Sequence, residues 1–234
     1  MKERKVYTAA SLEDKATEWL WNPYIPRGKI TMLHGESGVG KTMFAIKLMA
    51  ACTGKAKLER YGGQIKMGRC LYLTEEENLT AMIKPKLKDA GAGLEDIFII
   101  NDRLPITLAD NSLKDIILKN QISLMIIDPI SAYLESGFSE ENMEDIFTII
   151  LKLARLAKET GCAIVLVEET GGLEDIQTTL WRKTFGSHIP SYLCLSWDDD
   201  LECEERYLYH EASFLSLEGD PIKYELTARG IKCA

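Results

Sequence analysis

Short aliphatic runs alternate with amphipathic stretches along most of the chain. Five runs are almost continuously apolar and rich in β-branched residues, at 29–34, 69–74, 97–100, 122–128 and 162–168. Continuous apolar character is typical of strands covered on both faces, and strands that alternate with helices indicate a parallel sheet. The pattern therefore predicts an α/β domain with these five runs as interior strands.

The stretches between these runs have helical periodicity. The clearest pattern begins at Ser139 or Glu140 and ends at Gly161, a residue that suits a helix C-cap. Apolar residues recur there every three or four positions, so one face of the helix should pack on the sheet. Further helices are expected at 41–53, 79–90 and 113–120.

The pattern changes after about residue 170. A polar stretch over 171–187 is followed by strand-like runs at 192–197, 206–212 and 222–227. We interpret these three runs as antiparallel strands that extend one edge of the sheet. The polar stretch is expected to be a loop.

Composition narrows the class of protein. The chain is 46% hydrophobic and 27% charged, as an ordinary globular protein is. No apolar run approaches the roughly 20 residues of a membrane helix, and the N-terminus lacks the apolar stretch of a secretory signal, so we expect a soluble, cytoplasmic protein. The six cysteines form no CxxC pair, which argues against a zinc site and a disulfide framework.

The strongest chemical signal is the segment GESGVGKT, which satisfies the pattern G-x-x-x-x-G-K-S/T. It consists of Gly35, Glu36, Ser37, Gly38, Val39, Gly40, Lys41 and Thr42. Its glycines allow the main-chain N–H groups to face a phosphate, and the following helix adds its positive end. We expect Lys41 to contact the β- and γ-phosphates and the Thr42 hydroxyl to bind Mg²⁺. A chance match is the alternative, which the flanking strand and helix make rarer.

Carboxylates follow two of the predicted strands. Asp128 ends the run at 122–128, where a phosphate-loop protein needs a second metal ligand, although an aspartate there could also cap a turn before Pro129. The run at 69–74 ends in three glutamates, at 75–77, one of which could orient the attacking water. Alternatively, these glutamates form the acidic first turn of the next helix.

Four segments carry a family resemblance: WLWNPYIPRGKITMLHGESGVGKT, CLYLTEEENLTAMIKPKLKDAGA, LMIIDPISAYL and LARLAKETGCAIVLVEE. Together they resemble the RecA-like ATPases of the RepA-type helicase group found on plasmids, phages and bacterial mobile elements, over residues 19 to about 227. The resemblance implies ATP and Mg²⁺ as ligands, Lys41 and Glu76 as catalytic groups, and a ring of subunits. It also implies a mainly parallel sheet flanked by helices.

We therefore predict one RecA-like domain over 1–234. An N-terminal strap over 1–27 precedes a nucleotide-binding core over 28–168. A loop and the antiparallel C-terminal strands occupy 169–234.

The chain departs from the family at two polar positions. Glu169 stands where the family has a histidine, and Ala212 stands where it has a lysine that reaches the neighbouring subunit's nucleotide. Arg206 is one cation that could compensate. We expect slow ATP hydrolysis, and an ATP-sensing regulatory or assembly module with little hydrolysis stays open as an alternative. A small-molecule kinase is disfavoured because the region after 197 is acidic.

The stretch over 170–187 lies where RecA-like proteins that bind DNA place their pore contacts. It offers Trp181, Arg182 and Lys183, which could stack on a base and pair with phosphates of single-stranded DNA. A solvated or lid-like loop is the alternative, which we favour slightly. The net charge of −8 argues against binding DNA by phosphate neutralisation alone.

Overall fold

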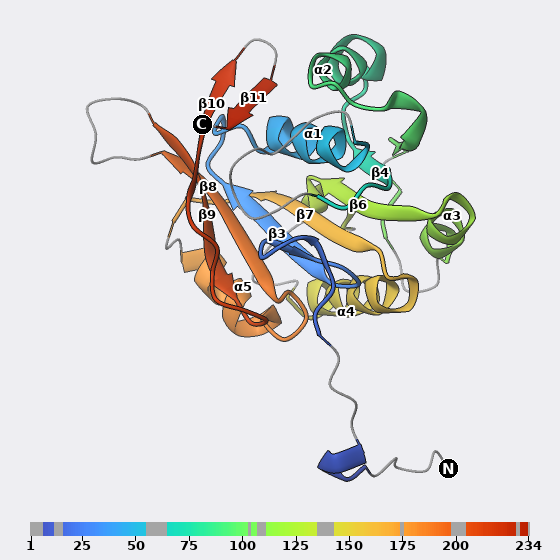
Figure 1. The fold of residues 1–234 in the computed structure, drawn as a ribbon, viewed down its shortest axis with the longest axis vertical. Helices are drawn as coiled ribbons and strands as arrows, with labels where there is room; N and C mark the ends of the chain where they lie inside the picture. Colours follow the sequence, from blue (N-terminus) through green and yellow to red (C-terminus); the bar gives the residue numbers. More distant parts are fainter. Residues whose placement is uncertain are drawn as a thin grey trace.

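The computed structural model describes residues 7–11, 16–54, 65–102, 104–106, 111–134, 143–173, 176–197, 205–227 and 230–233. Within these residues, nine strands form one mixed sheet in the order β11-β10-β9-β8-β3-β7-β6-β4-β5 (Figure 1). The sheet strands are β3 (Ile30–Gly35), β4 (Arg69–Thr74), β5 (Ile97–Ile100), β6 (Ile122–Asp128), β7 (Ala163–Glu169), β8 (Ser191–Trp197), β9 (Arg206–Ser213), β10 (Ile222–Thr227) and β11 (Gly230–Cys233). The predicted α/β class and C-terminal extension are confirmed.

Helices cover both faces of this sheet. The helices are α1 (Lys41–Cys52), α2 (Lys84–Asp89), α3 (Ser112–Asn120), α4 (Met143–Thr160) and α5 (Ile176–Phe185). A π-helical turn, η2 (Leu79–Ile83), leads into α2, and a 3-10 turn, η4 (Ile130–Tyr133), follows β6. The predicted helix starts at 139 and 140 lie outside the described residues.

The apolar residues form one core on each face of the sheet. On one face, α1 packs on the sheet together with side chains of α2 and the C-terminal strands. On the other face, α3, α4 and α5 cover the sheet (Figure 1). This arrangement explains why the central strands are apolar on both faces.

Three details of the predicted fold differ in the structure. The strand at 192–197, β8, pairs antiparallel with β9 as predicted, but it runs parallel to β3 on its other side, because α5 carries the chain back across the sheet. The helix α5 occupies Ile176–Phe185, within the segment 171–187 that was expected to be a loop. Strand β5 lies at an edge of the described sheet and not inside it, although both of its faces are partly covered.

Two short strands precede the sheet. They are β1 (Trp19–Trp21) and β2 (Ile25–Pro26), which pair antiparallel, and the side chains of Trp21 at the end of β1 and Tyr24 in the turn are buried. No described helix is both long enough and apolar enough to cross a membrane. The division into strap, core and C-terminal part stays a prediction.

Candidate phosphate-binding site

The phosphate loop connects the carboxyl end of β3 with the first residue of α1. Gly38 and Gly40 have φ angles of 79° and 109°, in the left-handed region that favours glycine. Because Lys41 is the first residue of α1, the loop leads directly into the N-terminus of a twelve-residue helix. Free N–H groups at that end and the helix dipole both favour an anion.

Lys41 is bound by its own loop in this structure. Its Nζ donates to the carbonyl oxygens of Gly35 at 2.9 Å and Glu36 at 2.8 Å, and lies 3.9 Å from Glu169 Oε2. Burial lowers the pKa of Lys41, while the negative charge of Glu169 and then that of Asp128 act in the opposite direction. A bound phosphate would compete with two carbonyl groups and one carboxylate for this ammonium group.

Asp128 lies at the carboxyl end of β6, in register with Thr74 on β4. Its Oδ2 accepts a hydrogen bond of 2.8 Å from the Tyr72 hydroxyl. Burial raises the pKa of Asp128, while hydrogen bonds from Tyr72 and Thr42 and the charge of Lys41 lower it. The structure thus brings together Thr42 and Asp128, the two residues predicted to bind metal.

This pair fits a magnesium ion. Mg²⁺ prefers oxygen ligands and is usually held by one or two protein groups together with substrate phosphates and water. Thr42 offers a hydroxyl oxygen and Asp128 a carboxylate oxygen, and both residues line the same cavity. A cation here would also offset the cost of the buried carboxylate. In the part of the chain that the structure describes, no group of three His, Cys, Asp or Glu residues could hold a metal ion.

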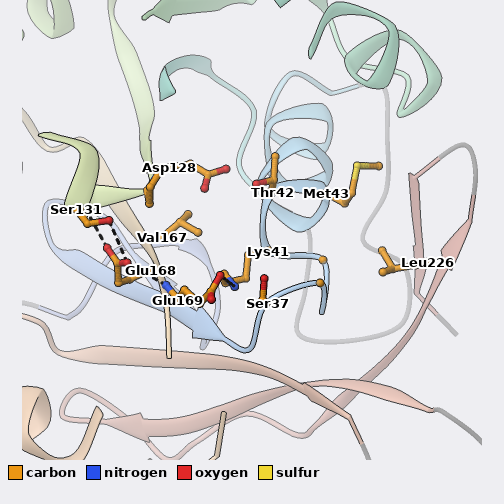
Figure 2. A pocket seen from close by; sticks show the side chains of 13 residues that line it. Ser37, Lys41, Thr42, Met43, Asp128, Ser131, Val167, Glu168, Glu169 and Leu226 are labelled. Atoms are coloured by element: carbon orange, nitrogen blue, oxygen red, sulfur yellow. Dashed lines mark hydrogen bonds and ion pairs between the residues drawn. The ribbon is translucent and has the colours of Figure 1, made fainter. Parts of the chain in front are cut away.

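These groups line one cavity of about 540 Å³ (Figure 2). Its lining residues are Ser37, Gly38, Gly40, Lys41, Thr42, Met43, Asp128, Pro129, Ser131, Val167, Glu168, Glu169 and Leu226. The volume lies within the range of roughly 300–1,000 Å³ that small-molecule sites occupy. Met43, Ser131, Glu168 and Leu226 were not identified from the sequence, because no local motif connects them with the phosphate loop.

Glu168 is a buried carboxylate that braces the loop after β6. Its Oε2 accepts from the Ser131 main-chain N–H at 2.9 Å, and its Oε1 accepts from the Ser131 hydroxyl and the Glu169 N–H, each at 3.1 Å (Figure 2). Burial raises the pKa of Glu168, while the hydrogen bonds from Ser131 lower it. These bonds fix the segment after Asp128 against the end of β7.

The three glutamates after β4 lie near the site but outside the lining of the cavity. Glu76 Oε1 accepts a 3.0 Å hydrogen bond from the Asn78 N–H, and so caps its own turn. The charge of Glu75 raises the pKa of Asp128, so Glu75 is electrostatically coupled to one of the two residues predicted to bind metal. The role of Glu76 in orienting water stays a prediction.

The predicted DNA contacts on 181–183 occupy three different environments. Trp181 is buried in the core, with 1% of its surface exposed, so its expected stacking on a base is wrong for this structure. The Trp181 ring lies on the apolar face of α5, which packs on the sheet. Arg182 lies 3.5 Å from Glu211 Oε1, whereas Lys183 is exposed.

Comparisons with known proteins agree with this geometry. A family model described as an AAA domain matches residues 5–173, which is more than half of the chain. A curated relative, the DNA repair and recombination protein RadB of Methanosphaera stadtmanae, is 24% identical over 216 residues, which cover 88% of each protein. The crystal structure of a KaiC-like protein from Pyrococcus horikoshii has a TM-score of 0.65 and 18% identity, and the match covers 92% of this chain and 93% of that one.

Proposed function

The chain belongs to the AAA domain family of RecA-like P-loop ATPases, and on this premise we propose that it is a Mg²⁺-dependent ATPase that hydrolyses ATP slowly. The observation that carries the proposal is the convergence of Lys41, Thr42 and Asp128 on one cavity at the carboxyl ends of parallel strands. In open α/β sheets, this edge is where ligands bind.

The phosphate loop would bind ATP by exchanging contacts within the protein for contacts to phosphate. Lys41 would leave the Gly35 and Glu36 carbonyl groups and donate to the β- and γ-phosphate oxygens, while the loop N–H groups surround the β-phosphate. Thr42 and Asp128 would hold Mg²⁺, which supplies positive charge to the β- and γ-phosphates as the bond between them breaks.

Glu76 is proposed to orient the attacking water through Oε2, since its Oε1 accepts from Asn78. A water held this way could attack the γ-phosphate in line with the leaving oxygen. Glu75 is the second candidate for orienting the water, because its negative charge raises the pKa of Asp128.

Slow hydrolysis is supported by the charges that face the cavity. Lys41 is the one cationic side chain among the described residues that line it, while Glu168 and Glu169 add two carboxylates. A further cation at the γ-phosphate is worth roughly 10³–10⁵ in rate in related chemistry. Arg206 does not supply it within the subunit, because its guanidinium lies over the Trp197 ring at 3.8 Å.

We further propose a role in DNA metabolism, as the name of the RadB relative suggests for that protein. In a ring of the RepA type, the lysine that would reach the neighbouring subunit's nucleotide is replaced by Ala212, so assembly would bring no cation from that position. Contact with single-stranded DNA is expected to be weak at physiological salt, because the net charge is −8 and Lys183 is the exposed member of the predicted trio.

A second function is supported by one specific observation. Glu169 lies 3.9 Å from Lys41 and would repel the charge that develops on a transferred phosphoryl group. The chain could therefore bind ATP as a regulatory or assembly ligand with almost no hydrolysis. In that case, Glu169→His would leave phosphate release unchanged, whereas the slow ATPase should become faster in this variant.

The glutamates provide the direct test of the proposed chemistry. Glu76→Gln keeps the size of the side chain but weakens its ability to polarise water, so hydrolysis should be lost while Mg²⁺·ATP affinity in calorimetry is kept. Glu77→Gln is the matched control and should retain hydrolysis. If Glu75→Gln abolishes hydrolysis and Glu76→Gln does not, the water is held by Glu75 and the assignment of Glu76 is wrong.

A further inference from the structure

The cavity continues past the phosphate loop to an apolar end formed by two side chains. Met43 follows Thr42 on α1, and Leu226 comes from β10 near the end of the chain. Figure 2 shows both side chains on the far side of Thr42 from Asp128. Neither residue belongs to the phosphate-loop motif.

The β10–β11 hairpin that supplies Leu226 is fixed to the phosphate loop. The Tyr224 hydroxyl donates a buried 2.8 Å hydrogen bond to the Val39 carbonyl oxygen. Leu226 packs so closely on Gly40 that a Cβ atom at that position would lie 2.9 Å from Leu226 Cδ2. The apolar end is therefore a built wall of the cavity and not a loosely placed hairpin.

The direction of a bound nucleotide follows from the polar end. Asp128 and Thr42 hold the metal side, where the β- and γ-phosphates belong. A triphosphate laid along the loop with its γ-phosphate near Asp128 directs its α-phosphate toward the residues after Thr42. The ribose and base must then leave the loop at Met43 and Leu226.

Among the described residues that line the cavity, the two side chains at this end offer contact area but little means to read a base. A thioether sulfur is at most a weak acceptor, and a leucine side chain neither donates nor accepts hydrogen bonds. Discrimination between adenine and guanine rests on their exocyclic groups, which strong selectivity must meet with hydrogen bonds.

We propose that Met43 and Leu226 form the base subsite of the cavity, which holds a purine by apolar contact and does not distinguish ATP from GTP. This inference rests on the proposed phosphate site and adds the range of nucleotides that the site accepts.

The first test compares three ligands on the unmodified chain by calorimetry in Mg²⁺: ATP, GTP and inorganic tripolyphosphate, which has neither ribose nor base. The dissociation constants of ATP and GTP should agree within about threefold, because apolar contact is similar for both purines. A preference of more than about tenfold for either purine would show polar reading of the base and overturn the proposal.

The second test truncates the two side chains that form the apolar end of the cavity. Leu226→Ala and Met43→Ala should each weaken ATP and GTP roughly fivefold through lost apolar contact, and leave tripolyphosphate unchanged. The matched control is Leu217→Ala, because Leu217 is 86% exposed on the segment between β9 and β10. Thermal unfolding of each variant shows whether the fold is kept.

The outcomes separate the base subsite from the phosphate site. If both variants bind nucleotides as the unmodified chain does, or lose tripolyphosphate as strongly as ATP, the base does not rest on these side chains and the proposal fails. If the unmodified chain binds none of the three ligands, the phosphate site itself is wrong and the inference falls with it.

Discussion

Replacement of Gly40 by alanine tests how the C-terminal hairpin meets the phosphate loop. Gly40 has a φ of 109°, which lies outside the comfortable range of residues with a side chain. An added Cβ would also lie 2.9 Å from Leu226 Cδ2 and 3.2 Å from its Cδ1. Gly40→Ala should therefore incur both backbone strain and a steric overlap.

The two effects can be estimated separately. Backbone strain at such an angle costs about 1–3 kcal/mol. Displacement of the Leu226 side chain from its rotamer adds about 0.5–1.5 kcal/mol, and the reduced entropy of the unfolded chain returns about 0.4–1 kcal/mol. The net loss is about 0.5–4 kcal/mol, and its central value of about 2 kcal/mol corresponds to a fall in Tm of about 4–8 °C for a chain of this size.

Gly38→Ala is the matched control within the same loop. Gly38 has a φ of 79°, and no atom lies within 4 Å of the Cβ that alanine would add. This variant should incur backbone strain alone and unfold at a higher temperature than Gly40→Ala in calorimetry of the nucleotide-free protein. The steric share is measured by repeating Gly40→Ala in a Leu226→Ala background, where its cost should fall by about 1 kcal/mol.

An equal cost of Gly40→Ala in both backgrounds would refute this reasoning. The two substitutions would then be independent, and Leu226 would not rest on the phosphate loop in solution. The base subsite would lose its structural basis in the same experiment.

Two further predictions concern single side chains. Lys41→Ala should lower the affinity for Mg²⁺·ATP at least about 100-fold in calorimetry while the Tm shifts by no more than about 4 °C. The control Lys47→Ala, on the same helix, should bind Mg²⁺·ATP normally. If Lys41→Ala keeps its affinity, the assignment of the phosphate site is wrong. Burial lowers the pKa of His210 to about 4 from 6.5, and its Nδ1 accepts a 2.8 Å hydrogen bond from the Gly219 N–H. Because the unfolded chain gains this proton at higher pH than the folded one, stability should decrease as the pH falls from about 6.5 to about 4, and His210→Asn should flatten this slope in chemical denaturation.

Much of the sheet could be predicted because its signals are local. The parallel strands β3, β4, β6 and β7 are apolar on both faces and are separated by helical periodicity, so each segment carries its own assignment. The direction of β8 could not be read in this way. A single apolar run does not encode whether it pairs parallel or antiparallel, and that choice depends on whether the preceding segment is a crossover helix.

The helix α5 was missed because its apolar stripe is short and its remaining residues are polar. Trp181 and Phe185 are four residues apart and both are buried, and Ile176 and Leu180 have the same spacing in the sequence. The aromatic ring beside two cations suggested nucleic-acid stacking, but hydrophobic burial placed it against the sheet. Packing therefore outweighed the functional interpretation at this position.

The phosphate loop and Asp128 could be identified because their chemistry requires fixed residue types at fixed spacing. The contact between the β10–β11 hairpin and the phosphate loop could not be identified, because Tyr224 and Val39 are separated by 185 positions in sequence and meet only through the fold. The inward orientation of Glu168 was equally hidden. In a strand covered on both faces, the apolar pattern does not show which side the polar residues near its end face.

The most direct test of the central claim is the rate of phosphate release by the unmodified chain at saturating ATP and Mg²⁺, without nucleic acid, compared with Lys41→Ala prepared in the same way. We predict a rate above that of the variant but well below the roughly 10 s⁻¹ typical of enzymes. Release at tens per second, or a rate that Lys41→Ala does not change, would contradict a slow Mg²⁺-dependent ATPase built on this loop.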